Sequence, residues 1–583
     1  MLKGIPASPG IAIGKAYILE KENFCILEYR IKKEEVEKEI KRFKEAVEES
    51  KKQILELKER VKEKIGEKEA YIFQSYLSIL EDPLLIKGTI EKIKREKVNA
   101  ETALRQVYKS FPEKFKVVQL EFMQERFRDV EDVAERVMRN LLKSPILSLS
   151  HLEENIIVVA YDLAPSDTVS MDKEKVLGFA TDIGGRTSHT AIMARALEIP
   201  AVVGLRDVTK KVKPGTTIIV DGDRGRVIIN PTPAQIKKYE ERKRKFLAYR
   251  ETLETLKPLP AQTLDGREIE LAANIAGPEE VDLAVKNGAE GIGLYRTEYL
   301  YMNRTSLPTE EEQLQAYAAV AEKVAPHSVI IRTLDIGGDK FLSPLSVPKE
   351  INPFMGWRAI RLSLELVEIF KTQLRAILKA SRYGKVKVMF PMVSSLEEVK
   401  KANQILSEVK KELEKEGFSF SNPIEVGIMI EVPSAAIMAD VLAKEVDFFS
   451  LGTNDLIQYT LAVDRVNEKV AHLYQPLHPT ILRLIDNVIK AAHRENIWVG
   501  ACGEMASDPL GMAVLLGLGV DELSVAPTSI LEIKKVIRNL SWEETQKLAS
   551  HLLKLSTSQQ TRRYLGTKLG RRIRKILKEE NNA

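Results

Sequence analysis

The sequence predicts a multidomain α/β protein. A small α/β domain is interrupted by an inserted α-helical bundle, and a helical linker leads to a C-terminal (β/α)8 TIM barrel. Three observations support this. The chain has 583 residues, too many for one hydrophobic core. Apolar residues recur at helical spacing between residues 32 and 143. After residue 261, apolar strand-like runs alternate eight times with helix-length stretches.

The N-terminal segment predicts strands that belong to a sheet completed much later in the chain. Residues 1–22 contain apolar runs around a Ser8-Pro9-Gly10 turn but are too short to fold alone. Short strand-like runs follow at 156–161, 176–183, 201–204, 217–221 and 227–229. We therefore expect residues 1–22 and 145–230 to form one α/β domain.

Residues 23–144 predict the inserted helical domain. Val36, Ile40, Phe43 and Val47 are spaced by three or four residues, and charged residues fill the positions between them. This pattern is typical of a helical hairpin or bundle with a solvated outer face. Residues 231–260 are highly charged with few β-branched side chains, which indicates a linker helix.

The remainder, residues 261–583, predicts the barrel. Its strand-like runs lie at 269–274, 291–296, 329–335, 386–392, 426–431, 448–455, 498–502 and 522–526. Helix-length stretches separate them, as expected for repeated βα units. In such barrels the chemistry takes place at the carboxyl ends of the strands.

The composition excludes several functional classes. Lys and Arg number 89 against 84 Asp and Glu, so global charge gives no argument for nucleic acid binding. The N-terminus lacks a long apolar region, and we expect no membrane insertion. The chain has two cysteines, which is typical of a reducing compartment, and we expect a cytoplasmic protein.

One histidine motif predicts an anion site. Gly184 and Gly185 precede Thr187, Ser188 and His189, after a strand-like run and before a helical one. Thr187 or Ser188 can cap the new helix, whose N-terminus favours a negative charge. Arg195, about two turns further on, adds a positive charge that can reach back. A phosphorylated imidazole suits this setting; the alternative is a surface histidine after a glycine turn.

Basic residues at the barrel's strand ends predict a polyanionic substrate. Arg296 ends the second predicted strand, Arg332 lies in the third, and Arg465 follows the sixth. Lys340 and Arg358 lie in the long excursion after the third strand. Guanidinium groups bind carboxylate and phosphate oxygens in pairs and stay charged. A single arginine there is commonly a structural ion pair, but several on one face favour substrate binding.

Two carboxylates predict a metal site at the same face. Glu431 ends the fifth predicted strand and Asp455 the sixth. Two acidic ligands, completed by phosphate oxygens and water, commonly hold Mg²⁺; the alternative is that the arginines neutralise both. Cys502 ends the seventh predicted strand and is either an inert small hydrophobe or a proton donor.

With these motifs assembled, the chain closely resembles the enzyme I family of the bacterial sugar phosphotransferase system. The similarity covers essentially the whole length in the expected order. The matching motifs are the Ser8-Pro9-Gly10 start, the His189 motif, and the segments 332–340, 352–358, 451–455 and 501–506. The helical insertion matches less distinctively.

The resemblance implies a phosphoenolpyruvate-dependent phosphotransferase. His189 is then the phosphorylated residue, Cys502 the proton donor, and Glu431 and Asp455 the Mg²⁺ ligands. The implied substrate-binding residues are Arg296, Arg332, Lys340, Arg358, Asn454, Asp455 and Arg465. The helical insertion becomes the docking domain for the histidine-containing phosphocarrier protein, and the family suggests a homodimer through the barrel.

Two other functions stay open at this stage. One is an enzyme similar to pyruvate phosphate dikinase or phosphoenolpyruvate synthase, which shares the histidine domain and barrel but has a nucleotide-binding domain. This chain has no Walker-type loop, and its insertion is built of charged helices. The other is a phosphoenolpyruvate-sensing scaffold without catalysis, which the intact set of candidate catalytic residues disfavours.

Overall fold

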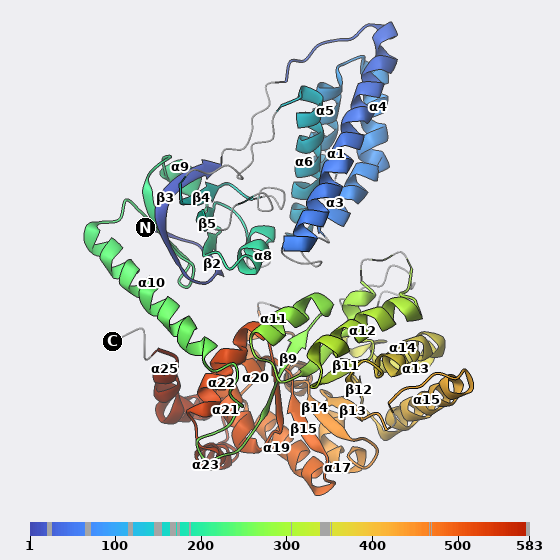
Figure 1. Cartoon of the computed structure of the whole chain (residues 1–583), viewed down its shortest axis with the longest axis vertical. Coiled ribbons are helices and arrows are strands. Elements are labelled where there is room, and N and C mark those ends of the chain that lie inside the picture. The colour runs from blue at the N-terminus through green and yellow to red at the C-terminus, as the bar shows by residue number, and fades with distance from the viewer. Residues whose placement is uncertain are drawn as a thin grey trace. The chain divides into compact units, whose positions relative to one another are not determined.

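The structure is a computed structural model that describes residues 1–19, 26–64, 72–114, 121–144, 154–163, 171, 175–185, 188–302, 304, 306–337, 350, 352–421, 423–465, 467 and 469–578. The chain divides into two compact units, Met1–Leu247 and Ala248–Ala583 (Figure 1). The first unit holds a mixed sheet and a set of long helices. The second holds a closed barrel.

The sheet of the first unit joins the N-terminus to strands from beyond the helices. β3 (Ile11–Leu19) pairs in parallel with β4 (Ile156–Ala160) and antiparallel with β7 (Thr217–Asp221). The strand order is β1-β8-β7-β3-β4-β5-β6-β2. The remaining strands are β1 (Leu2–Lys3), β2 (Ile5–Ser8), β5 (Val176–Thr181), β6 (Ala201–Val203) and β8 (Arg226–Ile229). The predicted sheet, with the N-terminal strands inside it, is confirmed.

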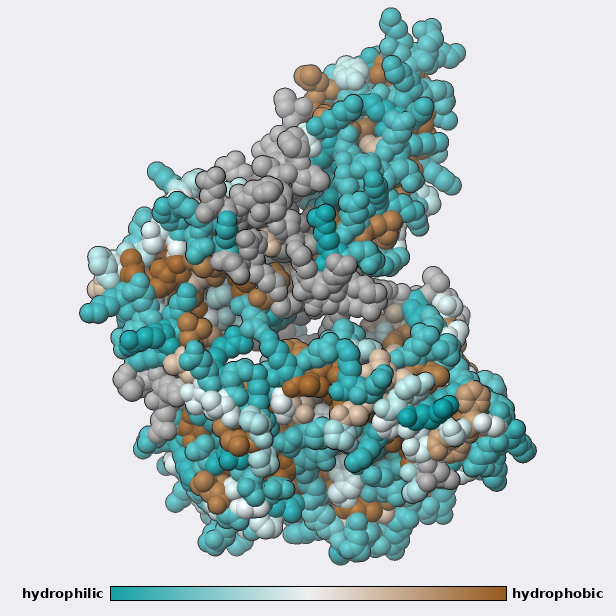
Figure 2. Space-filling model, viewed as in Figure 1, coloured by the Kyte–Doolittle hydropathy of each residue, from teal (hydrophilic) through white to brown (hydrophobic). Residues whose placement is uncertain are grey.

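The segment between β3 and β4 is helical, as predicted. It contains α1 (Val36–Lys64), α3 (Ile72–Glu81), α4 (Pro83–Glu96), α5 (Ala100–Lys114) and α6 (Glu121–Leu142). Their apolar faces share a core that includes Phe43, Ile54 and Leu104. Pro83 occupies the first turn of α4, where its missing N–H costs nothing, and Asp82 caps that helix. Figure 2 shows a mainly hydrophilic outer surface over these helices.

The predicted linker region contains a helix, α10 (Pro233–Glu254). Arg242 of α10 forms an ion pair of 2.8 Å with the buried Asp221 at the end of β7. Further along, Tyr249 and Leu253 pack against Leu531, and all three residues belong to the second unit. The boundary between the two compact units falls within this helix.

The second unit is the predicted (β/α)8 barrel. Every neighbouring pair of its strands is parallel, and the order β10-β11-β12-β13-β14-β15-β16-β9 closes on itself. The strands are β9 (Glu270–Ile275), β10 (Ile292–Arg296), β11 (Ser328–Arg332), β12 (Lys385–Phe390), β13 (Val426–Ile430), β14 (Phe448–Leu451), β15 (Trp498–Ala501) and β16 (Glu522–Val525). All eight predicted runs therefore become strands.

Helices follow the strands and surround the barrel in Figure 1. They are α11 (Val281–Lys286), α12 (Glu310–Val324), α13 (Ile360–Glu365), α14 (Val367–Ala380), α15 (Leu396–Lys415), α16 (Pro433–Ile437), α17 (Ala439–Leu442), α18 (Thr453–Leu461), α19 (Pro479–Arg494), α20 (Glu504–Ser507), α21 (Pro509–Leu518), α22 (Ile530–Arg538), α23 (Trp542–Leu552), α24 (Ser558–Leu565) and α25 (Arg571–Lys578). Leu294, Ile330, Met389 and Phe448 fill the barrel interior. The mouth is thus built on a rigid, packed frame. Among the described residues, no helix combines the length and apolar character that a membrane crossing requires.

The opposite end of the barrel holds an acidic pair, the buried Glu522 and the exposed Glu270. Glu522, the first residue of β16, is buried, and its Oε1 has no hydrogen-bond partner within the described part of the chain. Burial, together with the nearby Glu270, raises the pKa of Glu522 to about 8. Glu522 therefore keeps its proton near neutral pH in the folded protein, whereas the unfolded chain releases it near pH 4.5.

Replacing Glu522 by glutamine is expected to stabilise the protein under alkaline conditions. Between the unfolded and folded pKa values the native state binds more protons, so the stability of the wild type falls as pH rises. The difference in the free energy of unfolding between Glu522→Gln and the wild type should grow by about 2 kcal/mol, in favour of the variant, from pH 6 to pH 8. Denaturant unfolding of the two proteins across this range measures it, with the exposed Glu268→Gln as control. A pH-independent difference would contradict the prediction.

Candidate active site

A cavity of about 230 Å³ opens at the carboxyl ends of the barrel strands. It is lined by most of the residues that the sequence predicted there. These are Arg296, Arg332, Arg358, Glu431, Asn454, Asp455, Arg465 and Cys502. The βα architecture brings them together from strands far apart in the chain. Lys340 lies outside the described residues.

Four of these eight side chains stand at a strand end. Arg296 and Arg332 are the last residues of β10 and β11, and Glu431 and Cys502 directly follow β13 and β15. The prediction was wrong for Asp455. β14 ends at Leu451, and Asp455 lies in the first turn of α18 because the chain turns into a helix after Gly452. The carboxylate still lines the cavity.

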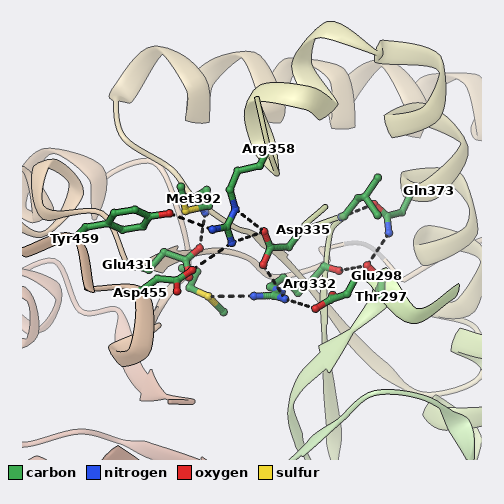
Figure 3. A network of polar contacts seen from close by, with 12 residues as sticks. Thr297, Glu298, Arg332, Asp335, Arg358, Gln373, Met392, Glu431, Asp455 and Tyr459 are labelled. Carbon is green, nitrogen blue, oxygen red and sulfur yellow. Dashed lines mark hydrogen bonds and ion pairs between the residues drawn. The ribbon is translucent and has the colours of Figure 1, made fainter. Parts of the chain in front are cut away.

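Arg332 is held between two carboxylates (Figure 3). Its Nη2 lies 2.9 Å from Glu298 Oε1 and 3.0 Å from Asp335 Oδ2. Burial alone would lower the pKa of the guanidinium, but Glu298 and Asp335 outweigh it and raise the pKa above its usual value. The buried Nε has no hydrogen-bond partner among residues that the structure describes. An anion in the cavity could supply one.

Arg358 makes a second buried network beside the first (Figure 3). Its Nη2 donates to Asp335 Oδ1 at 2.9 Å and to Asp455 Oδ2 at 3.2 Å, and its Nη1 donates to Tyr459 Oη at 3.0 Å. Gly337 allows this approach, since a Cβ there would lie 2.2 Å from the Cβ of Arg358. Asp335 therefore joins Arg332 and Arg358 into one unit.

Glu431 is an almost fully buried carboxylate of the cavity. Its Oε1 accepts a hydrogen bond of 2.7 Å from the backbone N–H of Met392, which has a positive φ of 55°. Strained backbone of this kind persists where the surroundings enforce it, commonly at functional sites. Burial, together with the nearby Asp455 and Asp335, raises the pKa of Glu431 to about 8. Gly452 makes room, because a Cβ there would lie 2.8 Å from the Glu431 Cβ.

The carboxylates of Glu431 and Asp455 fit a hard cation. Mg²⁺ prefers carboxylate oxygens and keeps positions for substrate oxygens and water. Within the described residues, no cluster of three or more His, Cys, Asp or Glu side chains could enclose a metal ion. A cation bound here would depend on substrate oxygens and water for its remaining ligands. Burial is the main cause of the raised pKa of Glu431, and a cation bound here would favour its ionised form.

Cys502 is 4% exposed and borders both the cavity and the barrel core. Ser450 Oγ donates to its Sγ at 3.4 Å, and the thiol donates to the Leu451 carbonyl at 3.6 Å. Burial raises the pKa of the thiol to about 11. The side chain is therefore protonated at neutral pH and suited to act as an acid.

Asn454 and Arg465 occupy the more open side of the cavity. Arg465 Nη1 donates to Glu504 Oε1 at 3.1 Å, and Asn454 Oδ1 accepts from the Glu504 backbone N–H at 3.0 Å. The Arg465 side chain is 39% exposed, so this ion pair contributes little to stability and can be exchanged for a substrate anion.

The histidine motif lies in the first unit. α8 (His189–Ala196) begins at His189, and Ser188 is its N-cap, accepting a hydrogen bond of 3.4 Å from the Ala191 N–H. The predicted helix start is thereby confirmed, while Thr187 lies outside the described residues. Arg195, in the last turn, donates to the Ala7 carbonyl at 3.1 Å.

The sequence analysis missed the residues that hold the arginines. These are Glu298, Asp335 and Tyr459, together with the backbone of Met392. Glu298 and Asp335 follow β10 and β11 by two and three residues. The rule that polar residues near barrel strand ends serve the site could have identified both. Tyr459, inside a helix, carries no such signal.

Three family models match the chain. The PEP-binding domain of PEP-utilising enzymes matches residues 250–542, their N-terminal domain residues 3–126, and their mobile domain residues 152–225. The phosphoenolpyruvate-protein phosphotransferase of Geobacillus stearothermophilus is 50% identical over 96% of both chains. That of Bacillus subtilis is 50% identical over 96% of this chain and 98% of its own. An NMR structure of enzyme I matches 42% of this chain and 99% of its own at 47% identity, with a TM-score of 0.36.

The two relatives match nearly the whole chain at 50% sequence identity, which shows the family of this protein. The arginine and carboxylate cavity lies inside the segment that matches the PEP-binding domain, and His189 lies inside the segment that matches the mobile domain. The chain belongs to the phosphoenolpyruvate-protein phosphotransferase family.

Proposed function

We propose that the protein transfers the phosphoryl group of phosphoenolpyruvate to His189 and then to the histidine-containing phosphocarrier protein. Pyruvate is released, and the reaction is the first step of a sugar phosphotransferase system. One observation carries the proposal: the barrel-mouth cavity combines buried arginines, two candidate metal ligands and a protonated thiol. This combination matches a small phosphorylated acid whose leaving group must be protonated.

The arginines account for substrate binding. Phosphoenolpyruvate carries a phosphate and a carboxylate, and guanidinium groups bind both in bidentate fashion. Arg332 and Arg358 are rigidly oriented by Glu298, Asp335 and Asp455, so binding requires little ordering. Arg296, Asn454 and Arg465 line the same cavity and complete the set. Lys340 is proposed as a further ligand from the family motif.

Glu431 and Asp455 are the proposed Mg²⁺ ligands. When bound, the ion would neutralise charge on the phosphoryl oxygens, which suits a loose transition state that needs electrostatic stabilisation. Asp455 would then serve both the metal and the orientation of Arg358. Glu431 is kept in place by the Met392 N–H.

The proposed reaction combines phosphoryl transfer to His189 with protonation of the leaving group. The neutral imidazole of His189 attacks phosphorus in line, a P–N bond forms, and the bond from phosphorus to the enol oxygen breaks. The enolate of pyruvate leaves with the electron pair. The Cys502 thiol protonates its methylene carbon to give pyruvate, and solvent reprotonates the thiolate. Thr187, Ser188 and Arg195 are proposed to support the phosphohistidine.

Each predicted domain has its own role in the proposed reaction. Residues 1–22 and 145–230 would carry the phosphohistidine, residues 23–144 would bind the phosphocarrier, and residues 231–260 would connect them to the barrel. Residues 261–583 would bind phosphoenolpyruvate and form a homodimer. We place the protein in the cytoplasm, where phosphoenolpyruvate and the carrier are available.

Mass spectrometry of the intact protein tests the function. Incubation with phosphoenolpyruvate and Mg²⁺ should add one acid-labile phosphoryl group, which subsequent addition of the phosphocarrier protein removes. Peptide mapping at alkaline pH should place the group on His189, and His189→Ala should gain none. Phosphoenolpyruvate binding without any incorporated phosphate would instead support the sensing scaffold. A requirement for nucleotide would support a dikinase-like enzyme.

Metal binding at neutral pH is expected to release a proton. Because the pKa of Glu431 is raised to about 8, its carboxyl is mostly protonated at pH 7 and must ionise to act as a ligand. Calorimetric titration of Mg²⁺ with phosphoenolpyruvate, in buffers of different ionisation enthalpy, measures the release. It should be smaller at pH 9 than at pH 7 and absent in Glu431→Gln. Equal release at both pH values would contradict the assignment.

A further inference from the structure

A buried polar network stands behind the arginines and outside the cavity. Its centre is Gln373 of α14, whose side chain is almost completely buried. Its Oε1 accepts from the Leu334 backbone N–H at 2.9 Å. Its Nε2 donates to Thr297 Oγ1 at 3.1 Å and to Tyr317 Oη at 3.2 Å. One amide therefore contacts the segments that follow β10 and β11.

Thr297 extends the connection to the backbone of Arg332. Its hydroxyl donates to the Arg332 carbonyl at 2.8 Å while it accepts from Gln373. Thr297 also directly follows Arg296, the last residue of β10. A fully buried threonine with both hydrogen-bonding roles in use fixes the separation of two adjacent strand ends (Figure 3).

The same contacts fix the carboxylates that orient Arg332. Glu298 follows Thr297, and Asp335 follows Leu334, so each acidic residue is anchored through its preceding neighbour. Neither Gln373 nor Thr297 lines the cavity. They can therefore influence substrate binding only through the residues that they hold.

We propose that Gln373 and Thr297 are positioning residues that set the spacing and orientation of Arg296 and Arg332 for phosphoenolpyruvate. This inference rests on the proposed function of the cavity. Loss of the Thr297 hydroxyl removes one of the two acceptors of Gln373 Nε2 and the side-chain donor to the Arg332 carbonyl, and the two strand ends lose their direct link. Substrate affinity then falls although every group that touches substrate is intact.

The test compares three variants of the full chain. Thr297→Val removes the hydroxyl at nearly constant volume and should raise the KM for phosphoenolpyruvate about 10-fold, with kcat lowered much less. Thr297→Ser keeps the hydroxyl and should restore the KM to within about twofold of the wild type. Tyr301→Phe removes a buried hydroxyl that donates only to Gln313, at the far end of the same network. It should lower the melting temperature but not change the KM.

The outcomes separate the two proposals. If the wild type does not consume phosphoenolpyruvate, the proposed function fails. If the wild type is active and Thr297→Val keeps its KM, or Tyr301→Phe raises the KM equally, the positioning role is overturned. Either of these two results with an active wild type would show that the network affects only the stability of the fold. Melting temperatures of all variants, measured in parallel, show whether any change in KM merely follows unfolding.

Discussion

Cys502→Ala should form pyruvate about 10² to 10⁴ times more slowly than the wild type, the usual contribution of a general acid. Its affinity for phosphoenolpyruvate should change by less than about twofold, since removing a buried thiol leaves the arginines in place. The raised pKa of about 11 keeps the proton on the thiol until the enolate forms. Steady-state pyruvate formation and calorimetric binding together measure the two effects.

The chain offers a matched control for this experiment. Cys25→Ala changes the only other cysteine and should leave turnover at the wild-type level. If Cys502→Ala turns over normally, the thiol has no part in the chemistry. A parallel loss of binding and turnover would instead show that Cys502 supports the shape of the cavity.

Arg358→Lys should lower kcat/KM for phosphoenolpyruvate by about 100-fold or more, although the charge is retained. The guanidinium of Arg358 contacts Asp335, Asp455 and Tyr459 at once, and a single ammonium cannot reproduce this planar fork. Disrupting one member of a buried charge network commonly costs about 2–5 kcal/mol. The change also frees Asp455 from its ion pair and disturbs the proposed metal ligand.

Arg382 is exposed, so Arg382→Lys is the control for this substitution. Its kcat/KM should equal that of the wild type. Excess Mg²⁺ should recover only a small part of the lost activity in Arg358→Lys, because the missing element is directional hydrogen bonding to substrate. Full recovery would show that Arg358 acts through the metal site alone.

The repeating elements of this fold could be predicted from the sequence because each has a local signal. The barrel strands are short apolar runs that end in polar residues, and each lies close to its predicted range. The positions of Arg296, Glu431 and Cys502 follow from predicted strand ends alone, whereas β11 ends at Arg332, three residues before the predicted end. The N-cap role of Ser188 is likewise encoded within a few residues.

The contacts between site residues could not be predicted because they depend on packing between distant segments. Asp335 joins Arg332 to Arg358, which comes from an excursion whose path no periodicity specifies. The sequence predicts a strand from Phe448 to Asp455, but its apolar residues end at Leu451. The chain turns at Gly452, and α18 begins at Thr453, two residues before Asp455. Tyr459 reaches Arg358 only because α18 packs beside the cavity.

The placement of β3 has a consequence for biosynthesis. Both of its neighbours, β4 and β7, are made more than a hundred residues after it, beyond the entire helical segment. During translation the local contacts of α1 to α6 can form early, while β3 keeps two unpaired edges. Such edges favour pairing with other chains. The nascent protein is therefore most vulnerable to aggregation between emergence of β3 and emergence of β7, and chaperone contacts should concentrate in that interval.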